Sequence, residues 1–166
     1  MQDLQKHMTW KAIPFAGLAG GTVFLLVNLV LTPLLLQLDS LLILRYFASL
    51  VMGSAVLTDT TSTTAALVGV LVNYALSIVF ALVIALVIHR WGLLVGIIGG
   101  AILGLCIYAI DLYTMTRFFE WFFAINSPVL LISHVLYGAV VGAVYESFDH
   151  YDVPVRGGPM SGEVRS

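Results

Sequence analysis

The sequence is poor in charged residues. Of its 166 residues only 10% are Asp, Glu, Lys or Arg, whereas 60% are hydrophobic. Soluble domains carry about 25% charged residues, so this composition excludes an ordinary water-soluble domain and indicates an all-α polytopic membrane protein. The formal net charge is only −2, and no basic cluster is present. Nucleic acid is therefore excluded as a partner, because neutralising phosphates requires clustered Lys and Arg.

Cysteines and catalytic motifs are also scarce. Cys106 is the single cysteine, so the chain cannot form an intramolecular disulfide. It has no HExxH, Walker or GxSxG motif. His134 and Asp111 offer two metal ligands and Glu120 a possible third, whereas zinc sites take three or four protein ligands. We therefore expect no enzymatic activity, no cofactor and no metal site.

Long apolar runs are abundant. Four are long enough to cross a hydrocarbon core, which takes about 20 residues. They cover residues 12–36, 64–88, 92–114 and 128–148. The first run is longer than a signal-peptide core of about 7–15 residues, so we expect it to be retained. The pattern predicts one domain over 1–150, a four-transmembrane-helix bundle. A cytoplasmic tail over 151–166 is rich in Gly, Pro and Ser and is expected to be disordered.

Two shorter segments lie between these runs. Segment 41–57 is nearly long enough to span, but Arg45 and Gly53 favour an interfacial or re-entrant helix. An Arg in mid-membrane costs at least about 2.5 kcal/mol, although a fifth span remains the alternative. The segment beginning at Arg117 also starts with Arg and two aromatic residues, so a second such helix is expected between the third and fourth runs. Internal duplication and chance both explain this match.

The distribution of Lys and Arg predicts the orientation. In a four-span topology, Arg45 and Arg117 lie on one side of the membrane and the other five of the seven lie opposite. Short loops rich in Lys and Arg stay in the cytoplasm. We therefore expect a multi-pass protein of the cell inner (cytoplasmic) membrane with both termini cytoplasmic. The five residues on the cytoplasmic side are Lys6, Lys11, Arg90, Arg156 and Arg165.

Glycines recur every four residues in the third and fourth runs. A helical step of four residues drifts only about 40° around the axis, so these glycines share a face of each helix. Among lipids, small residues let two helix backbones approach closely. The pattern predicts that the third and fourth helices pack through a glycine zipper. Its members are Gly92, Gly96, Gly100, Gly104, Gly138 and Gly142.

Polar residues continue these two faces. Asp111 follows Gly104 by seven residues, and His134 precedes Gly138 by four. An ionisable group within a span is a functional hypothesis by default. We expect Asp111 and His134 to lie within hydrogen-bond or one-water reach near the outer surface, and Arg45 and Arg117 to complete a polar pocket. The alternative is that these four residues have a structural role and fix the interfacial helices on the helix bundle.

A second group of ionisable residues lies at the other ends of the helices, at the predicted cytoplasmic surface. It contains His89, Arg90, Glu146, Asp149 and His150. We expect these residues to form a solvated rim.

The run IDLYTMTRFFEWF and the following SHVLYGAVVGAVY resemble a group of small uncharacterised bacterial four-span membrane proteins. In that group an aromatic segment precedes a last helix of H-x-x-[YF]-G-x-x-x-G type. The resemblance covers residues 108–145. It implies a membrane-embedded helical bundle and gives weight to His134, Gly138 and Gly142. It implies no activity.

Three functions are open at this stage. A non-enzymatic accessory or assembly subunit of a membrane complex is expected first, because the chain has little soluble mass and several grooved helix faces. The alternative is an oligomeric small channel or proton-coupled transporter that uses Asp111 and His134 as relay groups. The third is an intramembrane enzyme or cofactor binder around His134. Expected partners are the lipid bilayer and either another membrane protein or a second copy.

Overall fold

The computed structural model describes residues 8–89 and 92–151, and these residues form helices and short connections without a strand. The all-α class is therefore confirmed. The predicted tail over 151–166 lies outside the described residues, apart from Tyr151, where the last helix ends. In chain order the helices are α2 (Ala12–Leu36), α3 (Leu42–Met52), η1 (Ser54–Leu57), α4 (Thr63–Ile88), α5 (Leu93–Phe118), η2 (Glu120–Ile125) and α6 (Pro128–Tyr151).

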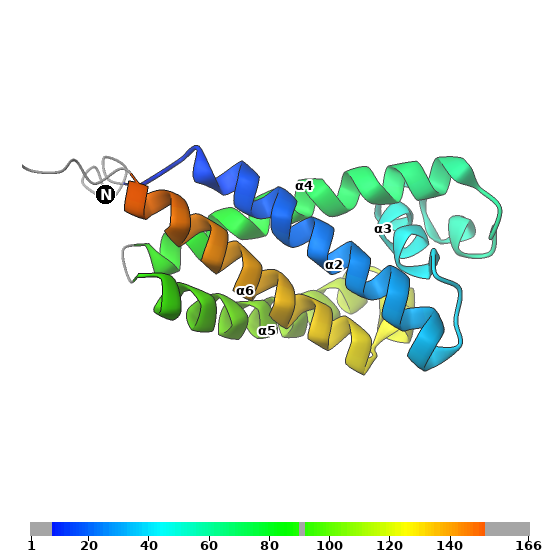
Figure 1. Cartoon of the computed structure of the whole chain (residues 1–166). Coiled ribbons are helices and arrows are strands. Elements are labelled where there is room, and N and C mark those ends of the chain that lie inside the picture. The colour runs from blue at the N-terminus through cyan, green and yellow to red at the C-terminus, as the bar shows by residue number, and fades with distance from the viewer. Residues whose placement is uncertain (1–7, 90–91, 152–166) are drawn as a thin grey trace, which may run out of the picture.

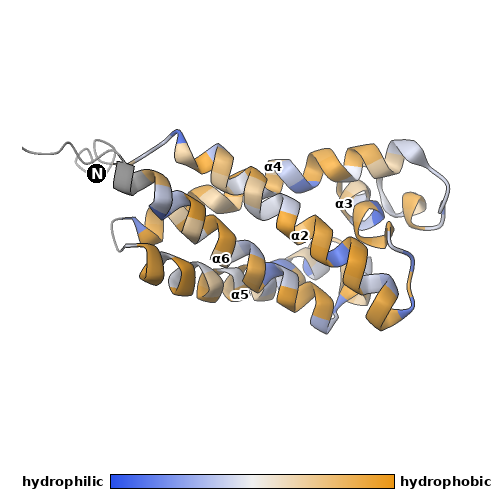
Figure 2. Ribbon diagram, in the orientation of Figure 1, coloured by the Kyte–Doolittle hydropathy of each residue, from blue (hydrophilic) through white to orange (hydrophobic). Residues whose placement is uncertain are grey.

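Four helices in the described part of the chain, α2, α4, α5 and α6, are long and apolar enough to cross a membrane. Figure 2 shows that apolar residues dominate all four. The bounds of α2 are the predicted ones, whereas α5 continues past residue 114 to Phe118. Nothing in residues 115–118 breaks a helix, since the next proline is Pro128. The predicted span ended at residue 114 because it was defined by its apolar residues, whereas the helix itself continues to Phe118.

The four long helices run between the same two ends of the molecule (Figure 1). At one end, here called the hairpin end, α4 ends at Ile88 and α5 begins at Leu93. At the opposite end, here called the α3 end, lie α3, η1 and η2. α5 packs mainly on α6, and α2 packs on both α6 and α4. The start of α6 is fixed by Ser127, whose hydroxyl accepts a hydrogen bond from the N–H of Leu130 at 3.2 Å.

The segment over 41–57 is not a fifth span. Its α-helix, α3, has 11 residues and at 1.5 Å per residue is about 16 Å long, roughly half the thickness of a hydrocarbon core. It packs on α4, where Gly69 lies against the carbonyl group of Leu44. The similar segment after Arg117 forms the 3-10 helix η2 instead. The two segments therefore differ in structure, so the fold adds no support for a duplication.

α5 and α6 touch through their backbones. A Cβ atom added to Gly100 would overlap the carbonyl oxygen of Gly138, and one added to Gly104 would overlap that of His134. Gly142 meets the carbonyl oxygen of Gly96 in the same way. This close approach positions the polar side chains that follow on both helices.

Gly92 does not belong to that contact, contrary to the prediction from its spacing. It precedes α5 with φ +85°, and a Cβ atom there would meet nothing within 4 Å. Gly92 is a turn glycine, because this backbone conformation disfavours residues with a side chain. Helix α5 begins at Leu93, one residue after the first glycine of the four-residue pattern.

Candidate functional site

Asp111 and His134 face each other across the α5–α6 contact. The Nε2 atom of His134 lies 3.6 Å from the Oδ2 atom of Asp111, inside the one-water reach expected from the sequence. Each residue lies about 10 Å from the α3 end of its helix, at 1.5 Å per residue. The His134 side chain is 10% exposed and the Asp111 side chain 26%. The pair is therefore largely enclosed, and Asp111 is its more accessible member.

The other ring nitrogen of His134 determines how the pair holds protons. Nδ1 lies 2.8 Å from the backbone oxygen of Leu130, one helical turn earlier. A carbonyl oxygen only accepts hydrogen bonds, so Nδ1 carries a proton. In the neutral ring, Nε2 then presents a lone pair to Asp111. One proton between the two side chains gives either an ion pair or a neutral acid–imidazole pair.

Aromatic rings surround the imidazole. The ring of Phe24 meets it edge-on at a centroid distance of 4.9 Å, and the ring of Tyr108 lies at 5.6 Å. Tyr137, also close by, donates its hydroxyl proton to the backbone oxygen of Ser77 at 2.6 Å. These rings make the surroundings of the imidazole apolar, and in an apolar setting the interaction between an acid and an imidazole is stronger than in water.

The pair borders a cavity of about 70 Å³, called here the inner cavity. It has room for a few water molecules and is far smaller than the roughly 300–1,000 Å³ of small-molecule sites. Its lining comes from all four long helices and from α3 and η2. The lining residues are Phe24, Ile43, Tyr46, Phe47, Leu50, Asn73, Leu76, Ser77, Phe80, Ile107, Tyr108, Asp111, Leu112, Met115, Phe122, Ile125, Leu130, His134 and Tyr137.

The two arginines predicted for the pocket lie elsewhere, and this corrects the four-residue site. Arg45 is only 5% exposed, and its Nη1 atom lies 2.6 Å from the Oδ2 atom of Asp39. The face of α3 that carries Arg45 is directed to the α2–α3 connection, which supplies the carboxylate. Arg117 is exposed in the last turn of α5. Neither residue lines the inner cavity.

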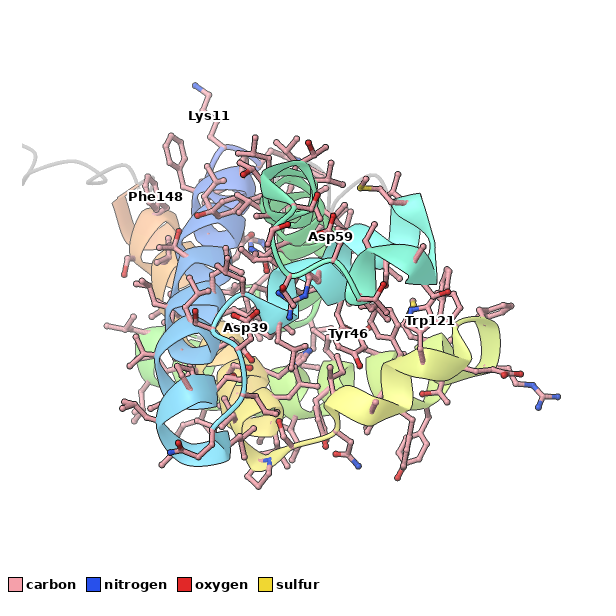
Figure 3. The ribbon with its side chains drawn as sticks, turned by 90° about the vertical axis from the view of Figure 1, so that its right-hand side faces the viewer. Lys11, Asp39, Tyr46, Asp59, Trp121 and Phe148 are labelled. Carbon is pink, nitrogen blue, oxygen red and sulfur yellow. The ribbon has the colours of Figure 1, made fainter. Side chains whose placement is uncertain are left out.

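The Arg45–Asp39 pair instead fixes the connection between α2 and α3. The guanidinium group of Arg45 and the backbone N–H of Leu41 both hydrogen-bond the Asp39 carboxylate and lower its pKa below the usual value. Figure 3 looks onto this end of the molecule, with Asp39 in the connection and Tyr46 and Trp121 where α3 and η2 meet. Trp121 donates its ring N–H to the hydroxyl of Ser49 at 3.0 Å, which joins η2 to α3.

At the hairpin end, Arg90 and the side chains of Asp149 and His150 lie outside the described part of the chain, and Glu146 differs from the prediction. Glu146 was expected in a solvated rim, yet its side chain is completely buried. Its Oε2 atom accepts a hydrogen bond from the N–H of Gly92 at 3.0 Å. Beside it, the Tyr145 hydroxyl lies 3.0 Å from Nδ1 of His89. The sequence held a signal for this burial, because Glu146 continues the four-residue spacing of Gly138 and Gly142.

Sequence reasoning also missed Tyr108 and Asn126. The Tyr108 hydroxyl donates a hydrogen bond to Oδ1 of Asn126 at 2.7 Å, linking α5 to the residue after η2. The contact joins residues 18 positions apart through an irregular connection, so helical periodicity does not reveal it. Within the described ranges, no group of three or more His, Cys, Asp or Glu side chains is arranged to hold a metal ion.

Comparison with known proteins gave no family model, no curated protein and no solved structure that matches the chain.

Proposed function

We propose that the chain is an integral protein of the cell inner membrane, with α2, α4, α5 and α6 as its spans and both termini in the cytoplasm. The four apolar helices support the spanning arrangement, and five of the seven Lys and Arg residues on the side of the termini support the orientation. In this orientation the α3 end faces outward, and α3 and η2 lie at the outer part of the bundle.

In this proposal the protein carries protons, as a small channel or as a proton-coupled transporter. The observation behind it is the Nε2 atom of His134, which faces the Asp111 carboxylate at 3.6 Å while Nδ1 is held by Leu130. An acid and an imidazole placed in this way exchange one proton without creating an uncompensated charge in an apolar setting. Intramembrane pairs of this kind are typical of proton relays.

The size of the inner cavity favours a proton over a larger substrate. Its volume of about 70 Å³ admits water but no organic molecule of ordinary size. Four helices rarely enclose a complete pathway, so the proposal includes self-association or a partner subunit. The pair then carries the proton through one step of a longer path.

A flux measurement tests the proposal. The purified protein is reconstituted in liposomes containing a pH-sensitive dye, and a potassium gradient with valinomycin drives proton entry. We expect Asp111→Asn to reduce the flux by about 100-fold, as for loss of a proton-transfer group. The matched control is Glu120→Gln, because Glu120 is exposed and does not line the inner cavity. Equal flux in Asp111→Asn and the unmodified protein would refute the proposal.

A second candidate is the accessory or assembly subunit. Only 22% of the most apolar stretch of α5 is buried inside the molecule, the lowest share among the four long helices. An apolar face of α5 is therefore available to a partner helix. The contacts of Gly96, Gly100 and Gly104 are used within the chain, so a partner would meet the opposite face. That face includes Leu94, Ile98, Ile102 and Leu105.

Photocrosslinking in native membranes tests this second candidate. A photoreactive residue replaces Ile102 on α5 or, as a control, Val79 on α4; the two side chains are 58% and 56% exposed. A partner on α5 yields a discrete protein adduct from position 102 and none from position 79. Lipid adducts alone from both positions would exclude a partner on this face.

A further inference from the structure

A second cavity, called here the outer cavity, lies at the α3 end and has a volume of about 310 Å³. It lies between the last turns of α2, the start of α3, η2 and the start of α6. Four uncharged polar residues contribute to its lining, so water is its natural content. The lining residues are Asn28, Thr32, Leu36, Leu38, Leu42, Ile43, Ala124, Ile125, Asn126, Ser127, Pro128 and Leu130.

Asn28 is the most enclosed of the polar residues, at 3% exposed. Its side-chain N–H donates to the backbone oxygen of Phe24 at 2.9 Å. The side-chain oxygen is left as an acceptor for water in the cavity that Asn28 lines. A buried amide of this kind is costly in an apolar bundle unless its oxygen is hydrated or bonded, which supports a hydrated outer cavity.

The outer and inner cavities share a wall. Ile43, Ile125 and Leu130 line both of them. All three side chains are apolar, so this wall separates polar space at the α3 end from the space beside Asp111 and His134.

One hydrogen bond joins residues on the two sides of this wall. Asn126 lines the outer cavity, Tyr108 lines the inner cavity, and the Tyr108 hydroxyl donates to Oδ1 of Asn126 at 2.7 Å. The Tyr108 ring also contacts His134, with centroids 5.6 Å apart. A hydroxyl has one donor and two acceptor positions, so Tyr108 can bond Asn126 and a water of the inner cavity together.

We propose that protons reach the Asp111–His134 pair from the α3 end, through water in the outer cavity and past the wall at the Tyr108–Asn126 hydrogen bond. This inference rests on the proposed proton-carrying function. Tyr108 acts as a positioning residue, because it orders water next to the pair and holds no net proton itself. The other titratable residues that line the inner cavity are Tyr46 and Tyr137.

The test follows hydrogen–deuterium exchange at the pair itself. Protein in liposomes is mixed with D₂O, and time-resolved infrared spectroscopy follows isotope-labelled His134 and the Asp111 carboxyl group. We expect Tyr108→Phe to slow the exchange by about tenfold or more, as for loss of one link in a relay. Tyr113→Phe is the matched control on the same helix, since Tyr113 is 71% exposed and does not line either cavity. An unchanged rate in Tyr108→Phe would overturn the route.

A second measurement remains useful if Tyr108→Phe folds poorly. In a Cys106→Ala background, Thr32→Cys places a thiol in the outer cavity, and a charged methanethiosulfonate added from outside modifies it. The route requires that the thiol is modified and that modification slows exchange at the pair. Thr60→Cys, at an exposed position in the connection before α4 that lines neither cavity, controls for effects of labelling. Rapid exchange after complete modification of Thr32→Cys would instead indicate entry from another side.

The two proposals fail in different ways. If the unmodified protein shows no protonation change at Asp111 or His134 across the pH range, the proton-carrying function is wrong, and the route is wrong with it. If the pair titrates and conducts but neither Tyr108→Phe nor blocked Thr32→Cys slows exchange, only the route is wrong. A purely structural role of Tyr108 would lower thermal stability and alter the titration of the pair, rather than slow its exchange alone.

Discussion

Glu146, near the end of α6, accepts a hydrogen bond from the backbone N–H of Gly92 at 3.0 Å, which ties the last turns of α6 to the residue that precedes α5. Gly92 makes this contact with φ +85° and ψ 160°, a conformation that essentially only glycine adopts. The hairpin end therefore depends on a turn residue and a buried carboxylate together.

Gly92→Ala is accordingly expected to destabilise the protein by about 1–3 kcal/mol, since the backbone is strained for any residue with a side chain. Unfolding in mixed detergent micelles, followed by circular dichroism, measures the change. The control is Gly99→Ala, where the added Cβ meets only Ile88 Cγ2 at 3.4 Å and a helical conformation favours Ala. A Gly92→Ala variant as stable as Gly99→Ala would contradict the prediction.

Gly100→Ala tests the contact between α5 and α6. The added Cβ would overlap the backbone oxygen of Gly138, and a backbone atom cannot move aside as a side chain can. We expect destabilisation of about 1–3 kcal/mol or more, as for overpacking of a tight core, and a loss of proton flux because the Asp111–His134 distance increases. Gly99→Ala, one residue earlier on the same helix, is again the control. Normal flux in Gly100→Ala would show that the pair tolerates helix separation.

The sequence was sufficient where periodicity governs the structure. A run of 25 largely apolar residues defines α2, although Pro33 lies inside the helix, and four-residue spacing placed Gly100 and Gly138 on facing surfaces. The same spacing predicted that Asp111 and His134 lie together. Asp111 is two helical turns from Gly104 and His134 is one turn from Gly138, so both lie on the facing surfaces.

Local turns and side-chain partners were beyond such reasoning. Gly92 fits the spacing of the packing glycines but belongs to a turn, which only its backbone angles reveal. Arg45 was assigned to the pocket because it lies between two spans, yet its carboxylate partner, Asp39, precedes it by six residues, in the α2–α3 connection. Arg45 pairs with Asp39 and not with Asp111 on α5, because closing the short loop between residues 39 and 45 costs less conformational entropy than bringing two distant segments together.

The Asp39–Arg45 contact predicts a dependence of stability on pH. Its hydrogen bonds hold the pKa of Asp39 below the usual value in the folded protein, while the unfolded value is about 3.9. The unfolded state therefore binds this proton first as the pH falls. The stabilisation is present above about pH 4 and is lost as the pH falls through the lower folded pKa.

Asp39→Asn should remove this acid-sensitive component and leave buried Arg45 without its counter-charge. We expect a loss of about 1–3 kcal/mol at neutral pH and a flatter stability profile below about pH 4. Thermal unfolding across a pH series measures both effects. Glu120→Gln, at an exposed position on η2, serves as the control. If Asp39→Asn kept the acid dependence of the unmodified protein, another carboxylate would be responsible.

The coupling between Asp111 and His134 can be measured with a double-mutant cycle. If one proton is exchanged between Nε2 and the carboxylate across 3.6 Å, the two side chains act as a unit, and effects of residues that act as a unit are not additive. Asp111→Asn, His134→Gln and the double variant should therefore all show the same low flux, with no further loss in the double variant. Independent sites would instead give effects that add as free energies. A double variant whose flux falls by the product of the two single losses would mean that the residues carry protons separately, despite their proximity.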